Sequence, residues 1–165
     1  MSEERSLPTG DAESHYAVDG GTIALDADEI LAILPHRSPV LLVDRVYSLV
    51  PRQHAVGSKA VTGNEFGLSR PRQGFVFPST LAFEAVGQLA ALALLFDSER
   101  EAGVEPSVAL AGVQDLTIHR EMLEGGVIHM SVHIVRVRMG IARVEGHATI
   151  EGEAYLDAVF DLAFG

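Results

Sequence analysis

The segment from Thr80 to Phe96 constrains the fold more than any other part of the chain. Nearly all of its residues are Ala, Leu, Val, Phe or Gly, and the polar exceptions inside it are Glu84 and Gln88. A helix that is apolar on all sides is buried in a core rather than laid on a surface. The sequence therefore predicts a long buried helix around which the rest of the chain folds.

Glu84 and Gln88 are spaced i, i+4, which places them on one face of this helix, one turn apart. A carboxylate among apolar residues needs a partner or a function, because removing an unpaired charge from water is costly. Glu84 is therefore the first candidate for a catalytic group, with Gln88 in a supporting role.

The composition narrows the possible functions. A chain of 165 residues is expected to form one domain. The formal charge of −11 argues against nucleic acid as a partner. The absence of cysteine excludes disulfides, thiolate nucleophiles and cysteine-ligated metals. His129 and His133 share a strand face but stand about 13 Å apart, so no metal site and no cofactor is predicted.

The chain is predicted to begin with a flexible, acidic lead-in over residues 1–24, followed by a single domain over residues 25–165. The polar N-terminus does not resemble a signal peptide. The apolar run of residues 80–96 is shorter than the roughly 20 residues that a membrane span requires. We therefore expect no membrane span and a cytoplasmic protein.

The remaining pattern predicts an α+β fold of one long helix with about five to six antiparallel strands. Asp26 is predicted to cap a short helix that Pro35 ends, and strands follow over residues 39–50 and 55–62. Residues 63–77 are predicted to form a long loop. Apolar and polar residues alternate along the C-terminal part, with hairpin turns at Gly140 and at residues 151–152, and a slip in the alternation at Val135 indicates a bulge.

The run Leu34-Pro-His-Arg-Ser-Pro-Val-Leu-Leu-Val-Asp-Arg-Val46 closely resembles the opening motif of the FabZ-type 3-hydroxyacyl-acyl-carrier-protein dehydratases. The resemblance continues through Asn64-Glu65 to the helix that contains Glu84 and Gln88. It extends to Ala111-Gly112-Val113 and covers about residues 28–164. Several motifs in the right order are a more specific signal than any one of them.

The resemblance implies a hot-dog fold, in which the antiparallel sheet wraps around the long helix, and a dimer whose sites lie between subunits. It also implies the dehydration of 3-hydroxyacyl thioesters carried on acyl carrier protein, in fatty-acid or polyketide and polyene biosynthesis. In that family a histidine of one subunit removes a proton next to the thioester, and a glutamate of the other helps the hydroxyl leave. Glu84 occupies the glutamate position.

One departure from the family pattern is decisive. Arg70 falls nearest to the position of the family's histidine, and the chain has no histidine between His54 and His119. Arginine stays protonated and cannot act as a general base. We therefore expect a related, histidine-bearing hot-dog subunit as partner, with a heterodimer favoured over a homodimer.

Two alternatives remain open. The chain could be a non-catalytic binder of acyl chains or carrier protein, with Arg70 and Arg72 holding a phosphate or carboxylate. It could also be a hot-dog thioesterase that uses Glu84 as base or nucleophile.

Further residues are assigned on the resemblance. His36, in the opening motif, is assigned a structural role. The residues expected to bind substrate are Arg70, Phe75, Phe77, Pro78 and Leu81. The residues expected to dock the acidic carrier protein are Arg120, Arg136, Arg138 and Arg143.

Overall fold

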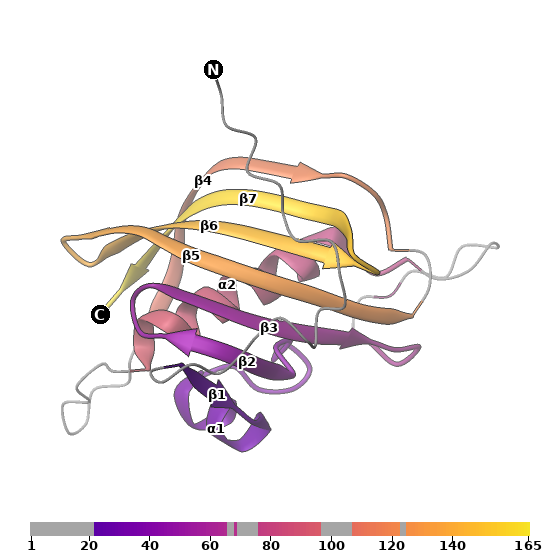
Figure 1. The fold of residues 1–165 in the computed structure, drawn as a ribbon, viewed down its shortest axis with the longest axis horizontal. Coiled ribbons are helices and arrows are strands. Elements are labelled where there is room, and N and C mark those ends of the chain that lie inside the picture. The colour runs from indigo at the N-terminus through magenta and orange to yellow at the C-terminus, as the bar shows by residue number, and fades with distance from the viewer. Residues whose placement is uncertain (1–21, 66–67, 69–75, 97–106, 123–124) are drawn as a thin grey trace.

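The structure is a computed structural model that describes residues 22–65, 68, 76–96, 107–122 and 125–165. It contains two helices and seven strands in these residues (Figure 1). In chain order they are β1 (Ile23–Leu25), α1 (Ala27–Ile33), β2 (Arg45–Val50), β3 (His54–Val61), α2 (Ser79–Leu95), β4 (Val108–Ile118), β5 (Gly126–Arg138), β6 (Ile141–Ile150) and β7 (Glu153–Phe164).

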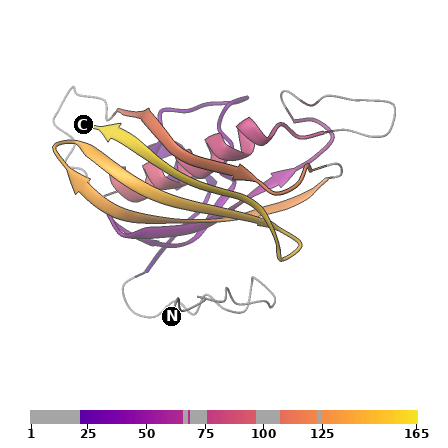
Figure 2. The ribbon, with the colours of Figure 1, turned by 90° about the horizontal axis from the view of Figure 1, so that it is seen from above.

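The seven strands form one antiparallel sheet in the order β1-β2-β3-β5-β6-β7-β4. The sheet curves, and α2 lies along its inner face, as Figures 1 and 2 show from two sides. The apolar side chains of α2 and of the inward positions of the strands form one continuous core. The predicted α+β class and the sheet wrapped around a long helix are both confirmed.

Helix α2 packs tightly on the centre of the sheet. Gly146 of β6 makes this possible, because a Cβ atom at that position would lie 2.5 Å from the Val86 side chain. Most residues of α2 from Ala82 to Leu95 are buried. The helix is nevertheless not covered on all sides, since the Glu84 side chain is 49% exposed. The expectation that Glu84 is buried was therefore wrong, because no described element covers that face of the helix.

Local sequence signals agree with the structure at several places. Asp26 caps α1 in a capping box with Glu29, in which each side chain accepts a hydrogen bond from the other's backbone N–H. Both predicted hairpins turn through two successive residues with positive φ, Met139-Gly140 and Glu151-Gly152. The pairing of β5 with β6 shifts between Ile134 and Arg136, which confirms the bulge near Val135.

The N-terminal part differs from the prediction in two respects. The sheet gains the short strand β1, so ordered structure begins before the predicted domain boundary at residue 25. The predicted strand over residues 39–50 starts only at Arg45. Its first part is a loop because the backbone N–H of Leu42 donates to the Gln88 side chain rather than to a neighbouring strand.

Strand β4 is one of the two edge strands of the sheet and differs from the other long strands in its exposure. The residues Leu110, Val113 and Leu116 pair with inward-facing positions of β7, yet each is more than 40% exposed. A strand edge with unpaired backbone groups and apolar side chains is a template for association. This edge borders the cavity between α2, β4 and β7.

None of the described helices is long and apolar enough to cross a membrane.

Candidate active site

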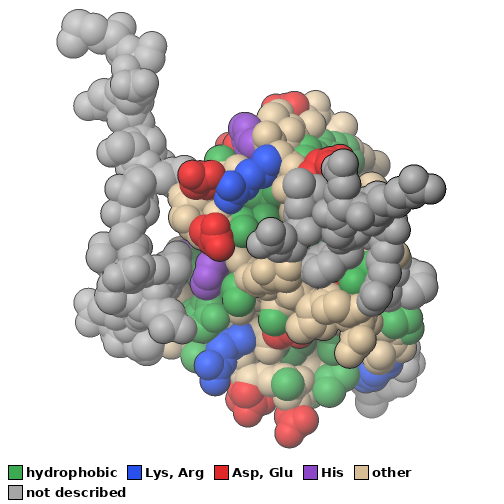
Figure 3. All heavy atoms as spheres, turned by 90° about the vertical axis from the view of Figure 1, so that its right-hand side faces the viewer, with side chains coloured by type: hydrophobic (Ala, Val, Ile, Leu, Met, Phe, Trp, Pro, Cys, Tyr) green, Lys and Arg blue, Asp and Glu red, His purple; other side chains and the backbone are tan. Residues whose placement is uncertain are grey.

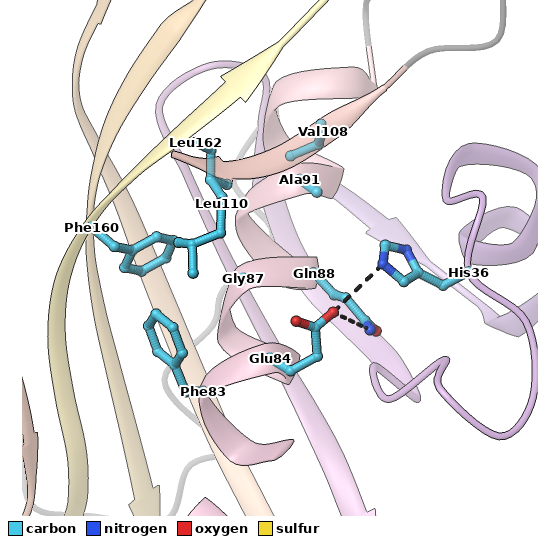
Figure 4. A pocket seen from close by; sticks show the side chains of 10 residues that line it. All are labelled: His36, Phe83, Glu84, Gly87, Gln88, Ala91, Val108, Leu110, Phe160 and Leu162. Carbon is cyan, nitrogen blue, oxygen red and sulfur yellow. Dashed lines mark hydrogen bonds and ion pairs between the residues drawn. The ribbon is translucent and has the colours of Figure 1, made fainter. Parts of the chain in front are cut away.

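A cavity of about 150 Å³ lies between α2, the edge strand β4 and the end of β7 (Figure 4). It has a polar end and an apolar end. The polar end is formed by His36, Glu84 and Gln88. The residues that line the rest are Phe83, Gly87, Ala91, Val108, Leu110, Phe160 and Leu162. A small apolar cavity with a few convergent polar groups is the usual form of a ligand site.

Gln88 holds the polar end of the cavity together. Its Oε1 accepts a hydrogen bond from the backbone N–H of Leu42 at 2.8 Å. Its Nε2 donates to the carbonyl of Val40 at 2.7 Å and to Oε1 of Glu84 at 3.0 Å. Gln88 is 1% exposed, and these bonds use its acceptor and both amide hydrogens. The side chain therefore fastens the loop before β2 to α2 and fixes Glu84.

The two oxygens of Glu84 have different surroundings. Oε1 accepts from Gln88 and lies 3.5 Å from Nε2 of His36. Figure 4 shows Oε2 directed away from both of these groups, and it has no partner among the described residues. One oxygen is thus held while the other is available to a ligand.

His36 enters the site from the loop that follows α1. Its side chain is 27% exposed, and Figure 4 shows the ring directed at Glu84. Its other ring nitrogen, Nδ1, is buried and has no hydrogen-bond partner in the described residues. Sequence reasoning gave His36 a structural role and did not bring it to Glu84. No local sequence signal places it there, because the loop that carries His36 is held by Gln88, a residue distant in the sequence.

The apolar end is closed by aromatic packing. The rings of Phe83 and Phe160 meet edge to face with centroids 5.2 Å apart and an interplanar angle of 80°. Phe160 and Leu162 are inward-facing residues of β7, and Leu110 of β4 is paired with Leu162. The sequence patterns did not single out Phe160, Leu162 or Leu110 as cavity residues, because their role depends on which strand lies next to β7.

The predicted substrate-binding residues are mostly elsewhere. Arg70 and Phe75 lie outside the described residues, as does Arg72. Phe77 is a core residue, 1% exposed, whose backbone bridges to Met122 rather than lining the cavity. Pro78 is the N-cap residue of α2, and Leu81 packs against the core. The structure therefore does not place Phe77, Pro78 or Leu81 in this cavity.

Glu65, which belongs to the stretch that resembles the family, makes an ion pair at the end of β3. Its Oε1 lies 3.1 Å from the ammonium group of Lys59, which is 5% exposed and also faces Asp44. This pairing anchors the chain where it leaves β3 and leads toward Arg70.

The four predicted docking arginines do not form one cluster. Arg136 and Arg138 are exposed beside the β5–β6 turn. Arg143 is bound to Asp161 by two hydrogen bonds, which raise the pKa of Arg143 and lower the pKa of Asp161. Arg120 binds Glu153 and the carbonyl of Ile150 at the β6–β7 turn, at the opposite end of the strands. That end faces the viewer in Figure 3, and acidic, basic and histidine side chains mix on it. Arg120 therefore cannot join the other arginines.

A second polar cluster lies on the outer face of the sheet. Asp157 is hydrogen-bonded to two histidines. Nε2 of His119 lies 2.6 Å from Oδ2 of its carboxylate, and Nδ1 of His147 lies 2.6 Å from Oδ1. Partial burial alone would raise the pKa of Asp157, but the hydrogen bonds from His147 and His119 outweigh it and lower that pKa. Nearby, burial raises the pKa of the Tyr155 hydroxyl to about 12, and its oxygen has no partner among the described residues.

Comparison with known proteins identifies the family. Residues 34–159 match the model of the FabA-like domain. The 3-hydroxyacyl-acyl-carrier-protein dehydratase FabZ of Bacillus subtilis is 34% identical over 142 residues, which cover 86% of this chain and 99% of the relative. FabZ of Cereibacter sphaeroides is 36% identical over 140 residues, covering 84% of this chain and 90% of the relative.

A likeness among solved structures concerns the fold. The dehydratase heterocomplex ApeI:P from Xenorhabdus doucetiae matches with a TM-score of 0.71 and 14% identity, over 82% of this chain and 90% of its own. The shared hot-dog architecture agrees with the match of the family model over most of the chain and with the identity to the two dehydratases. This chain belongs to the FabA-like family of hot-dog proteins.

Proposed function

We propose that this chain is a dehydratase subunit that acts on 3-hydroxyacyl thioesters carried by acyl carrier protein, in fatty-acid or polyketide biosynthesis. The observation that carries the proposal is Glu84 at the mouth of an apolar cavity, with one oxygen held by Gln88 and the other open. The relatives of this chain are 3-hydroxyacyl-acyl-carrier-protein dehydratases, which supports the choice of reaction.

The reaction requires an acid and a base on adjacent carbons. The base removes the proton next to the thioester carbonyl, and the electrons of that C–H bond form the new double bond. The C–O bond of the 3-hydroxyl breaks, and the oxygen leaves as water with the proton that Glu84 supplies. An apolar cavity favours this transfer because it excludes competing water.

We further propose that the base comes from a partner subunit. Arg70, which falls nearest to the position of the family's histidine, stays protonated and cannot accept the proton. The exposed edge of β4 next to the cavity offers a second hot-dog subunit a place to pair and to deliver a histidine. The solved dehydratase heterocomplex gives a precedent for two different subunits in one assembly.

Mixing experiments test this proposal. The purified chain, a histidine-bearing FabZ-type homologue and their mixture are assayed separately with 3-hydroxyacyl-carrier-protein substrates of several chain lengths. The homologue carries Gln in place of its own catalytic glutamate, so that it is inactive alone. We expect activity only in the mixture, with a loss of about 100-fold or more for Glu84→Gln in this chain.

Glu145→Gln is the matched control, because Glu145 is an exposed glutamate of β6 outside the cavity. Brisk dehydration by this chain alone would contradict the need for a partner. Full activity of the Glu84→Gln mixture would contradict the role of Glu84 and favour a non-catalytic binder. Hydrolysis of the thioester without dehydration would favour a thioesterase.

A further inference from the structure

His36 has no chemical role in the family resemblance, which assigns it only a structural one. His36 and Glu84 are 48 positions apart in the chain, yet Nε2 of the ring lies 3.5 Å from Oε1 of the carboxylate. Both residues line the same cavity, and the loop that carries His36 is fastened to α2 through Gln88. The hydrogen bonds of Gln88 therefore fix the loop of His36 relative to the helix of Glu84, so the two side chains do not meet by chance on a free surface.

The environment of the ring determines where its proton lies. Nδ1 is buried and has no acceptor among the described residues, so a proton there would be a buried donor without a partner. Nε2 faces a carboxylate oxygen, which is an acceptor. The neutral ring therefore carries its proton on Nε2 and presents it to Glu84.

A separation of 3.5 Å is long for a hydrogen bond. Catalytic hydrogen bonds are often long in ligand-free structures and shorten when substrate displaces water. An acyl chain in this cavity would remove water from the side of Glu84 that is now 49% exposed.

We propose that His36 is a positioning residue that, together with Gln88, decides which oxygen of Glu84 carries the acidic proton. Gln88 donates to Oε1, and Nε2 of His36 lies nearest to that same oxygen, so a proton on Glu84 sits on Oε2, the oxygen directed away from them. This inference rests on the proposed dehydratase function and adds to it.

The arrangement also acts after proton transfer. When the O–H bond at Oε2 breaks and the proton leaves with the substrate hydroxyl as water, Glu84 becomes a carboxylate. Gln88 already donates to that carboxylate, and Nε2 of His36 lies 3.5 Å from the same oxygen, so the developing charge is stabilised once the His36 contact has shortened around the substrate. Removing one such preorganised donor typically costs on the order of 10²-fold or more in kcat.

Two substitutions at His36 separate positioning from packing. In the active mixture, we expect His36→Leu to lower kcat by roughly 100-fold with little change in KM, because the lost donor acts mainly in the transition state. His36→Gln keeps an N–H near the position of Nε2 and should recover most of kcat. His133→Leu, an exposed histidine of β5, serves as control. Equal losses for His36→Leu and His36→Gln, or wild-type kcat for His36→Leu, would overturn the proposal.

Nuclear magnetic resonance of the full chain with ¹⁵N-labelled histidine gives a readout independent of activity. We expect His36 as the Nε2–H tautomer at a pH where it is neutral, with resonances that shift in the Glu84→Gln variant. An Nδ1–H tautomer, or resonances insensitive to Glu84→Gln, would overturn the inference. If the mixture never dehydrates but the tautomer is as expected, the proposed function fails while the His36–Glu84 arrangement stands.

Discussion

At the scale of single residues, the site shows how a carboxylate is kept on an otherwise apolar helix. Glu84 is neither fully buried nor free: Oε1 is occupied by Gln88 and approached by His36, while the other side is open to the cavity. Partial exposure avoids the cost of burying an unpaired charge. The same opening is what gives a substrate access to Oε2.

The spacing of Glu84 and Gln88 made their partnership predictable, because residues four apart on a helix are always neighbours. His36 could not be found in this way. Its approach to Glu84 depends on the loop after α1, which is shaped by a backbone-to-Gln88 hydrogen bond across 46 positions. Contacts of that kind depend on tertiary structure, and no local pattern encodes them.

The bridge between His119, Asp157 and His147 predicts a pH-dependent term in stability. The pKa of Asp157 is lowered in the folded chain, so the ionised carboxylate stabilises the fold above its ordinary value of 3.8. This contribution is lost as the pH falls from there through the lowered pKa. We expect Asp157→Asn to lower the free energy of unfolding by about 1 kcal/mol or less at pH 6, because the carboxylate is 43% exposed.

Chemical denaturation of both chains between pH 6 and pH 3 measures this difference, which should shrink below about pH 4. Asp115→Asn on β4 controls for the loss of one surface charge. A difference of the same size and pH dependence in that control would contradict the role of the histidine bridge.

At the scale of elements, the sequence predicted what local patterns encode. Helix α2 differs from the predicted residues 80–96 by one residue at each end, and both hairpin turns were placed correctly at Gly140 and at residues 151–152. The order of strands was not accessible from periodicity. That β4 pairs with β7, and leaves its other edge free, depends on contacts distant in sequence.

The free edge of β4 yields a test of association. Val113 is 45% exposed on the face that borders the core, so a lysine there would place a charge into any subunit interface formed by this edge. We expect Val113→Lys to weaken subunit association by roughly tenfold or more, equivalent to about 1.4 kcal/mol. Sedimentation equilibrium of the chain alone and with its partner measures the change.

Val127→Lys is the matched control, because Val127 is 40% exposed at the start of β5, away from the β4 edge. If Val113→Lys associates as the wild type does while remaining folded, β4 is not the interface. Equal weakening by both substitutions would indicate a general effect of added charge.

At the scale of the whole molecule, the distribution of charge matters more than its sum. The chain carries a net charge of −11, yet Arg136 and Arg138 stand exposed beside the β5–β6 turn. Ala142, just after this turn, pairs with Leu162, which lines the cavity. The turn therefore lies close to the cavity. A local basic patch on an acidic protein can still attract an acidic partner.

Reversing both charges tests whether carrier protein docks at this turn. In the active mixture, we expect Arg136→Glu with Arg138→Glu to raise KM for the carrier-bound substrate by about tenfold and to leave kcat nearly unchanged, because encounter is weakened and chemistry is not. A small thioester without carrier protein should be turned over equally by both chains. Arg45→Glu reverses one exposed charge elsewhere on the surface and should have no such effect. An equal rise in KM for the small thioester would mean that the arginines support the cavity rather than the docking of carrier protein. An equal rise in KM for the control variant would mean that net charge alone governs the encounter.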